Sequence, residues 1–141
     1  MLAAQEVDFE EAAKQWIDDN KDTVSEWTEG VDPVDGTSID LVSTPWDTER
    51  SSANVVKLVL EQQGYDVSLT SVSPSVMFQA IATGDGDASV APWMPSTHAA
   101  YYKKHKVDFE DLGENLEGAK LGLVVPSYMD TDSIEDLKPA E

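Results

Sequence analysis

The sequence predicts an α/β domain, in which short strands alternate with amphipathic helices. The chain has 141 residues, a usual size for one domain, and 40% of them are hydrophobic, which is enough for a core. From residue 38 onward, β-rich runs alternate with stretches of helical periodicity. Because ligands bind beyond the carboxyl ends of the strands in such sheets, we expect a site in the loops after Ser43 and Ala91.

The first 30 residues predict a helical segment. One apolar stripe at helical spacing is formed by Phe9, Ala12, Ala13, Trp16 and Ile17. Asp8, three residues before a glutamate, resembles a capping box at the start of this helix. A shorter helix follows over residues 21–28, and we expect Trp16 and Trp27 to pack in the core. Turn-forming residues mark 31–37 as a linker.

We expect residues 38–125 to form the α/β lobe and residues 126–141 to form a tail after it. Strands are expected at residues 38–43, 65–72, 88–91 and 120–125. Helices are expected over residues 48–63, from Pro74 to the turn at Gly84, over 97–106, and from Ser133 to Lys138.

Charge and composition argue against several classes of function. The chain carries 28 acidic and nine basic residues, a formal net charge of -19. This charge repels nucleic acid and anionic membranes, favours solubility, and is compatible with a cationic ligand. With no cysteine and two histidines, the chain is not expected to hold a metal or another cofactor. No apolar run is long enough to span a membrane, and the acidic residues 1–11 resemble a start inside a longer chain rather than a signal peptide.

Trp46 and Trp93 are the candidate binding residues. Each follows a short strand and a proline, in the segments STPWD and VAPWMPSTH, and proline stiffens the loop around it. Two indoles at one edge of a sheet can face a common cavity, where their π-faces attract a cation within about 6 Å. Ordinary packing of the two rings is the alternative that the spacing alone leaves open, and it is the more frequent outcome.

His98 lies five residues after Trp93 and can donate a hydrogen bond to a carboxylate. A lone histidine near a helix start is more often structural. No nucleophile elbow accompanies it, so the chain is not expected to be an enzyme. Asp47 is expected to cap the helix that follows it, and Glu49 to add a favourable charge to the first turn. The GDGD run at residues 84–87 predicts a turn rather than a calcium loop.

Most of the chain resembles the glycine betaine-binding components of osmoprotectant ABC importers, of the OpuAC type. The most specific segments are PWD with VLEQQGYDV, and WMPSTH; the later run LGENLEGAKLGLVVPSYMDTDSIEDLK also matches. Even AAKQWIDDNKDTVSEWTEGV resembles the helical segment that precedes this region in that family. The resemblance implies one lobe of a type II periplasmic-binding-protein fold, with a mixed sheet flanked by helices.

The resemblance also implies roles for single residues. Trp46 and Trp93 match two tryptophans of the family's aromatic cage, and His98 matches the histidine that binds the carboxylate. A trimethylammonium group cannot donate hydrogen bonds, so π-faces recognise it, whereas a carboxylate takes directed donors. The implied ligand is glycine betaine or a similar zwitterionic quaternary amine. Carnitine and proline betaine stay open, while choline would leave His98 without its partner.

Partners and location follow from the resemblance as further expectations. Members of the family have two lobes, so an amino-terminal lobe would complete the site and the tail over residues 126–141 would cross to it. We expect weak binding by this chain alone and docking on the membrane subunit of an ABC importer. The location would be extracytoplasmic, with attachment to the membrane through the transporter or through a lipid anchor absent from this chain. Exchange of tails would give a homodimer.

One alternative function belongs to a different class. The chain could be an interaction module that docks on a partner lobe or on the transporter membrane subunit without binding a ligand. Nucleic acid is not an expected partner in either case.

Overall fold

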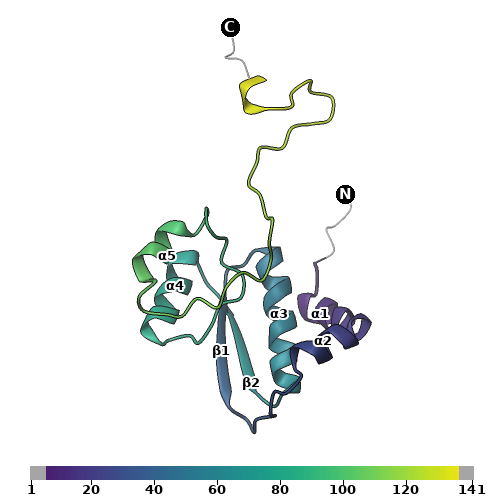
Figure 1. The fold of residues 1–141 in the computed structure, drawn as a ribbon, viewed down its shortest axis with the longest axis vertical. Helices are drawn as coiled ribbons and strands as arrows, with labels where there is room; N and C mark the ends of the chain where they lie inside the picture. The colour runs from purple at the N-terminus through teal and green to yellow at the C-terminus, as the bar shows by residue number, and fades with distance from the viewer. Residues whose placement is uncertain (1–5, 137–141) are drawn as a thin grey trace.

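The computed structural model describes residues 6–136 and shows a small parallel sheet between two groups of helices (Figure 1). The strands are β1 (Ser38–Ser43) and β2 (Asp66–Ser71). The other elements are α1 (Phe9–Asp19), α2 (Lys21–Trp27), α3 (Asp47–Gln62), α4 (Pro74–Thr83), α5 (Ala99–His105) and the 3-10 helix η1 (Ile134–Asp136). Helices α1, α2 and α3 lie on one side of the sheet, and α4 and α5 on the other.

The sheet is built on β1, which has a neighbour on each edge. β2 pairs with it in parallel along its whole length. On the other edge, Ala88 forms a single parallel bridge with Leu41, and Val42 N–H donates to the Ala88 carbonyl at 2.9 Å. The strand predicted over residues 88–91 is therefore reduced to one bridge. That bridge still leads the following loop past the carboxyl end of β1.

The strand predicted over residues 120–125 is wrong for this structure. Within residues 6–136 this segment has no paired neighbour, and its Leu121, Leu123 and Val124 side chains are exposed. A strand needs an adjacent edge to satisfy its N–H and C=O groups, and this part of the chain leads away from the sheet (Figure 1). The helix predicted from Ser133 is a single 3-10 turn, and its predicted end at Lys138 lies outside the described residues.

The core forms against both faces of the sheet. Its buried hydrophobic residues are Ala13, Ile17, Val24, Leu41, Val42, Ala53, Val67, Met77 and Phe78. Trp16 and Trp27, predicted to pack in the core, are instead 39% and 56% exposed and stack on each other with ring centroids 5.7 Å apart. Helices α1 and α2 form an outer layer beside α3, and the residues that they bury are Ala13, Ile17 and Val24.

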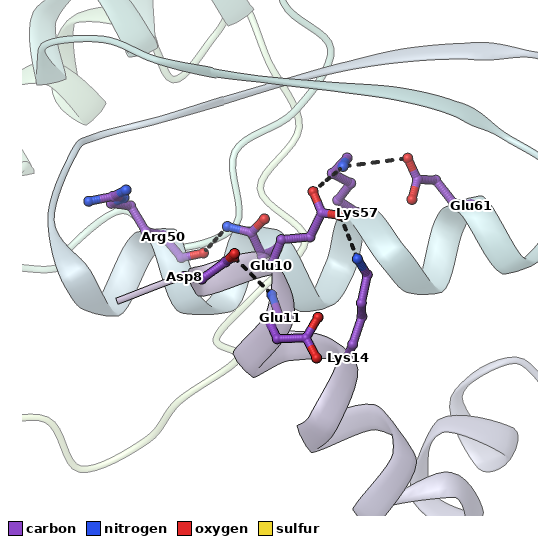
Figure 2. A network of polar contacts seen from close by, with 8 residues as sticks. Asp8, Glu10, Glu11, Lys14, Arg50, Lys57 and Glu61 are labelled. Atoms are coloured by element: carbon purple, nitrogen blue, oxygen red, sulfur yellow. Dashed lines mark hydrogen bonds and ion pairs between the residues drawn. The ribbon is translucent and has the colours of Figure 1, made fainter. Parts of the chain in front are cut away.

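Polar contacts join α1 to α3 (Figure 2). Glu10 of α1 accepts from Lys57 of α3 at 3.1 Å and from Lys14 at 2.9 Å. Hydrogen bonds from Lys14 and Lys57 lower the pKa of the Glu10 carboxyl. Nearby, the guanidinium carbon of Arg50 lies 4.2 Å from the centroid of the Phe9 ring. The amino-terminal helix is thus fixed to α3 by charge as well as by apolar packing.

The two long helices begin in different ways. Asp8 caps α1 as predicted, because its Oδ1 accepts from Glu11 N–H at 3.1 Å. The cap predicted for α3 is wrong. Asp47 is already the first helical residue, and the capping position belongs to Trp46, which makes no side-chain capping bond. The chain enters α3 one residue earlier than expected, so the Asp47 carboxylate lies inside the first turn.

The segment predicted as a linker is hydrogen-bonded to the end of α3. Val34 N–H donates to the Gln63 carbonyl at 2.8 Å, and Gly36 N–H donates to the Gly64 carbonyl at 2.9 Å. Gly64 has a φ of +93°, and a Cβ at this position would lie 1.9 Å from the Val34 carbonyl oxygen. Glycine is therefore required here both by the backbone conformation and by the close approach of the linker.

Candidate functional site

Trp46 and Trp93 meet beside the carboxyl end of β1. Trp46 precedes α3, and Trp93 lies in the loop that follows the Ala88 bridge. Their ring centroids are 4.6 Å apart, and the ring planes are inclined by 53°. Trp46 is partly buried, whereas Trp93 is 40% exposed. The structure therefore brings together the two tryptophans that the sequence singled out.

His98 contacts both tryptophans. Its ring stacks on Trp46, with centroids 5.4 Å apart and planes within 17°. Trp93 N–H donates to His98 Nδ1 at 2.8 Å, so Nδ1 is an acceptor and the ring proton belongs on Nε2. Nε2 is buried and has no hydrogen-bond partner within residues 6–136. A buried donor without a partner costs free energy, which makes this atom a candidate contact for a ligand.

The environment of His98 favours its neutral form. The side chain is fully buried, and burial lowers its pKa, while the nearby charge of Glu49 opposes that change. A neutral imidazole at neutral pH keeps Nδ1 available to the Trp93 backbone and Nε2–H available as a donor.

Sequence reasoning missed the pair formed by Thr44 and Glu49. Both residues are almost completely buried. Glu49 Oε2 accepts from Thr44 N–H at 2.8 Å and also from the Thr44 hydroxyl. Glu49 lies in the first turn of α3, as predicted, but its carboxylate folds back under the preceding loop to reach Thr44. The one feature of the sequence that could have indicated this pair is the position of Thr44, directly before Pro45 and Trp46.

An apolar groove of about 980 Å³ opens next to this cluster. It runs between α1, α3 and the loop around Trp93, and its aromatic walls are Phe9, Trp16, Trp27 and Trp93. Trp46 and His98 do not line it. Trp93 therefore separates two places, the cluster with Trp46 and His98 on one side and the open groove on the other.

These features suit recognition of a ligand rather than chemical conversion. Two inclined indole faces can hold a cation, and an N–H without a partner can hold an acceptor. Across residues 6–136, no group of three side chains could hold a metal ion. None of the helices in that range has the length and apolar character needed to cross a bilayer.

Comparison with known proteins places these residues in a family. Residues 37–141 match the family model described as the substrate binding domain of an ABC-type glycine betaine transport system, OpuAC. The chain belongs to the OpuAC family. It is 49% identical, over 136 residues, to the glycine betaine/carnitine transport binding protein GbuC of Listeria monocytogenes, covering 96% of this chain and 45% of that protein.

Two further relatives extend the comparison. The uncharacterized protein ORF1 of Chromohalobacter salexigens is 32% identical over 95 residues, covering 65% of this chain and 60% of that protein. The crystal structure of lactococcal OpuAC, closed around glycine betaine, is similar with a TM-score of 0.68 and 42% identity, over 72% of this chain and 40% of that one.

The comparisons confirm the predicted fold class. This OpuAC chain has the α/β architecture of a type II periplasmic binding protein, with a parallel sheet and flanking helices. The family model and GbuC are named as binding components of transport systems. The chain spans about half the length of the curated relatives it matches.

Proposed function

We propose that this chain is the lobe of an OpuAC-type protein that captures glycine betaine, or a similar quaternary amine, for an ABC importer. The observation that carries the proposal is the contact of the Trp46 and Trp93 rings, 4.6 Å apart at the edge of the sheet. The family and the ligand named for the lactococcal structure support the choice of glycine betaine.

The two indoles are proposed to bind the cation. A quaternary ammonium group has no N–H, so it makes no hydrogen bonds and is recognised by π-faces. We propose that one cation contacts both rings, whose centroids lie 4.6 Å apart and whose planes are inclined by 53°. Such a contact contributes about 2 kcal/mol or more once it is desolvated. Trp93 is exposed enough to adjust around a ligand, whereas Trp46 is held by its stack on His98.

His98 is proposed to bind the carboxylate. Its Nε2–H lacks a partner among residues 6–136, and a carboxylate would give it a charge-assisted hydrogen bond. Because His98 is fully buried, we propose that the exposed Trp93 ring moves to let the carboxylate reach Nε2 while Trp46 stays in place. A zwitterionic ligand can bind the indoles through its cation and His98 Nε2–H through its carboxylate. A simple cation can bind the indoles alone.

A second, amino-terminal lobe is part of the proposal. One face of the cluster is open at Trp93, so this lobe alone covers a ligand incompletely and binds it weakly. In this proposal the tail over residues 126–141 crosses to the second lobe, or is exchanged between two chains in a homodimer. The importer's membrane subunit is the docking partner. The protein then works outside the cytoplasm, held at the membrane by the transporter or by a lipid anchor.

Calorimetric titration with glycine betaine tests the proposal. The samples are this chain alone and this chain combined with the amino-terminal lobe of an OpuAC-type relative. We expect tight binding in the second sample, and a loss of affinity of about 30-fold in Trp46→Ala and Trp93→Ala, as a contact of about 2 kcal/mol implies. Trp16→Ala, in the groove, is the control and keeps its affinity. No binding to the combined lobes, or unchanged affinity in the two variants, contradicts the proposal.

The open groove favours one alternative function. Its walls carry two half-exposed tryptophans, Trp16 and Trp27, which suits contact with another protein. In that case the chain is a docking module for a partner lobe or for the transporter, and it binds no ligand itself. Trp46→Ala, outside the groove, would then leave betaine binding by the combined lobes unchanged, while Trp16→Ala and Trp27→Ala would abolish docking.

A further inference from the structure

The buried carboxylate of Glu49 has no part in the ligand contacts proposed above. Glu49 is 1% exposed and Thr44 is fully buried. One carboxylate oxygen, Oε2, accepts both the N–H and the hydroxyl of Thr44, whereas Oε1 is buried and has no partner among the described residues. Burying a carboxylate costs free energy unless hydrogen bonds satisfy it. The Glu49 carboxylate has one bonded and one unbonded oxygen, and it lies three residues after Trp46. Both features indicate a role for it in the tryptophan cluster.

We propose that Glu49 is a positioning residue for the quaternary-amine site, which holds Trp46 in place by anchoring Thr44. The inference rests on the proposed function and deepens it. Thr44, Pro45 and Trp46 are consecutive. Proline has no N–H and a fixed φ, so Thr44 provides the last backbone donor ahead of Trp46. Anchoring that donor fixes the direction in which the chain reaches Trp46.

The short segment is held from both ends. Upstream, Glu49 holds Thr44 N–H at 2.8 Å. Downstream, the Trp46 carbonyl accepts from Arg50 N–H at 2.9 Å, in the first turn of α3. Because Glu49 and Arg50 belong to the same turn, both anchors move with one helix. The Trp46 ring is then set in its place before a ligand arrives, which removes part of the ordering cost of binding.

A hydrogen-bonding role and a charge role for Glu49 make different predictions. Glu49→Gln keeps an oxygen that can accept from Thr44 but loses the negative charge. Glu49→Leu has a similar size and loses both. If Glu49 positions Trp46, the glutamine variant behaves like the wild type and the leucine variant does not. If its charge attracts the cation directly, both variants are impaired.

The first test uses the 141-residue chain without ligand. Proton–nitrogen NMR gives one indole N–H resonance for each of the four tryptophans. We expect Glu49→Leu to shift and broaden the Trp46 resonance, while the Trp16 and Trp27 resonances, from α1 and α2, stay in place as an internal control. Glu49→Gln should keep all four resonances. An unchanged Trp46 resonance in Glu49→Leu, or equal damage in Glu49→Gln, overturns the proposal.

The second test measures glycine betaine affinity with the amino-terminal lobe added. We expect a loss of roughly 10-fold or more in Glu49→Leu and a change within about 3-fold in Glu49→Gln, as the loss of a buried hydrogen-bond partner implies. If the wild type binds no betaine, the proposed function fails, while the resonances still decide whether Glu49 positions Trp46. If Glu49→Leu does not fold, Thr44→Val and Thr44→Ser replace it. The valine variant loses one of the two bonds to Oε2, the one from the hydroxyl, and should shift the Trp46 resonance, whereas the serine variant keeps both bonds and should not.

Discussion

At the scale of single residues, His98 shows how one backbone contact and one neighbouring ring set the state of a side chain. Its Nδ1 accepts from Trp93 N–H at 2.8 Å, and its ring lies against Trp46. Protonation would put a second N–H on Nδ1 and break the bond to Trp93. Burial acts in the same direction, because it lowers the pKa of His98 below its ordinary value of 6.5, and the charge of Glu49 opposes this in part.

The lowered pKa of His98 makes stability depend on pH. Below pH 6.5 the unfolded chain binds a proton that the folded chain does not, so the free energy of unfolding falls as pH falls, by at most about 1.4 kcal/mol per pH unit, until the folded pKa is reached. We expect urea unfolding between pH 5 and 7.5 to show this decline. In His98→Gln the free energy of unfolding falls less as pH falls. The difference in stability between this variant and the wild type therefore becomes smaller toward pH 5. His105→Gln, which retains His98, keeps the decline. Parallel curves for the wild type and His98→Gln would contradict this explanation.

The candidate site could be predicted from the sequence in part. Trp46 and Trp93 were found because each follows the end of a β-rich run, and strand ends of one parallel sheet lie at the same edge. His98 was found because it lies five residues after Trp93 and matches a histidine of the family. Glu49 was found as a first-turn charge only. Its burial depends on how α3 folds back under Thr44, which is a tertiary contact with no repeating pattern in the sequence.

At the scale of secondary structure elements, the helices were more predictable than the strands. A helix satisfies its backbone within itself, so periodicity and end signals locate α1, α3 and α4 closely. A strand exists only if another edge receives it. β1 and β2 pair with each other, over residues 38–43 and 66–71. By contrast, one bridge forms within residues 88–91, and none of the described residues pairs with residues 120–125. Their β-rich composition could not show whether a neighbouring edge would be present.

Asp8 and Asp47, at the starts of α1 and α3, should contribute differently to the free energy of unfolding. Asp8→Ala removes the side-chain acceptor of Glu11 N–H and should lower the free energy of unfolding by about 1 kcal/mol. Asp47→Ala removes no capping bond and should cost only a few tenths of a kcal/mol, from the charge near the start of α3. Asp8→Asn keeps an acceptor and should stay close to the wild type. Urea unfolding measures all three, and a larger loss in Asp47→Ala than in Asp8→Ala would show that the assigned capping positions are wrong.

At the scale of the whole molecule, a strong net charge opposes an exposed apolar segment. The formal net charge of -19 makes copies of the chain repel one another. Residues 107–134 nevertheless expose a series of large apolar side chains, which are Val107, Leu112, Leu116, Leu121, Leu123, Val124, Tyr128, Met129 and Ile134. Exposed apolar surface of this extent favours association. Which effect prevails depends on how strongly the solvent screens the charge.

Salt should therefore promote self-association of this chain. Raising the ionic strength from 0.01 M to 1 M shortens the screening length from about 30 Å to about 3 Å, which weakens the repulsion and leaves the apolar contacts in place. We expect light scattering to find monomers at low salt and a growing fraction of dimers or larger species at high salt. The double variant Leu121→Ser with Leu123→Ser preserves the charge and should stay monomeric at higher salt than the wild type. Val7→Ser, at a 55% exposed position ahead of α1, is the control and should associate like the wild type. Association that weakens as salt rises would mean that ion pairs hold the copies together, and association that is equal in the double variant would mean that residues 120–125 are not the contact.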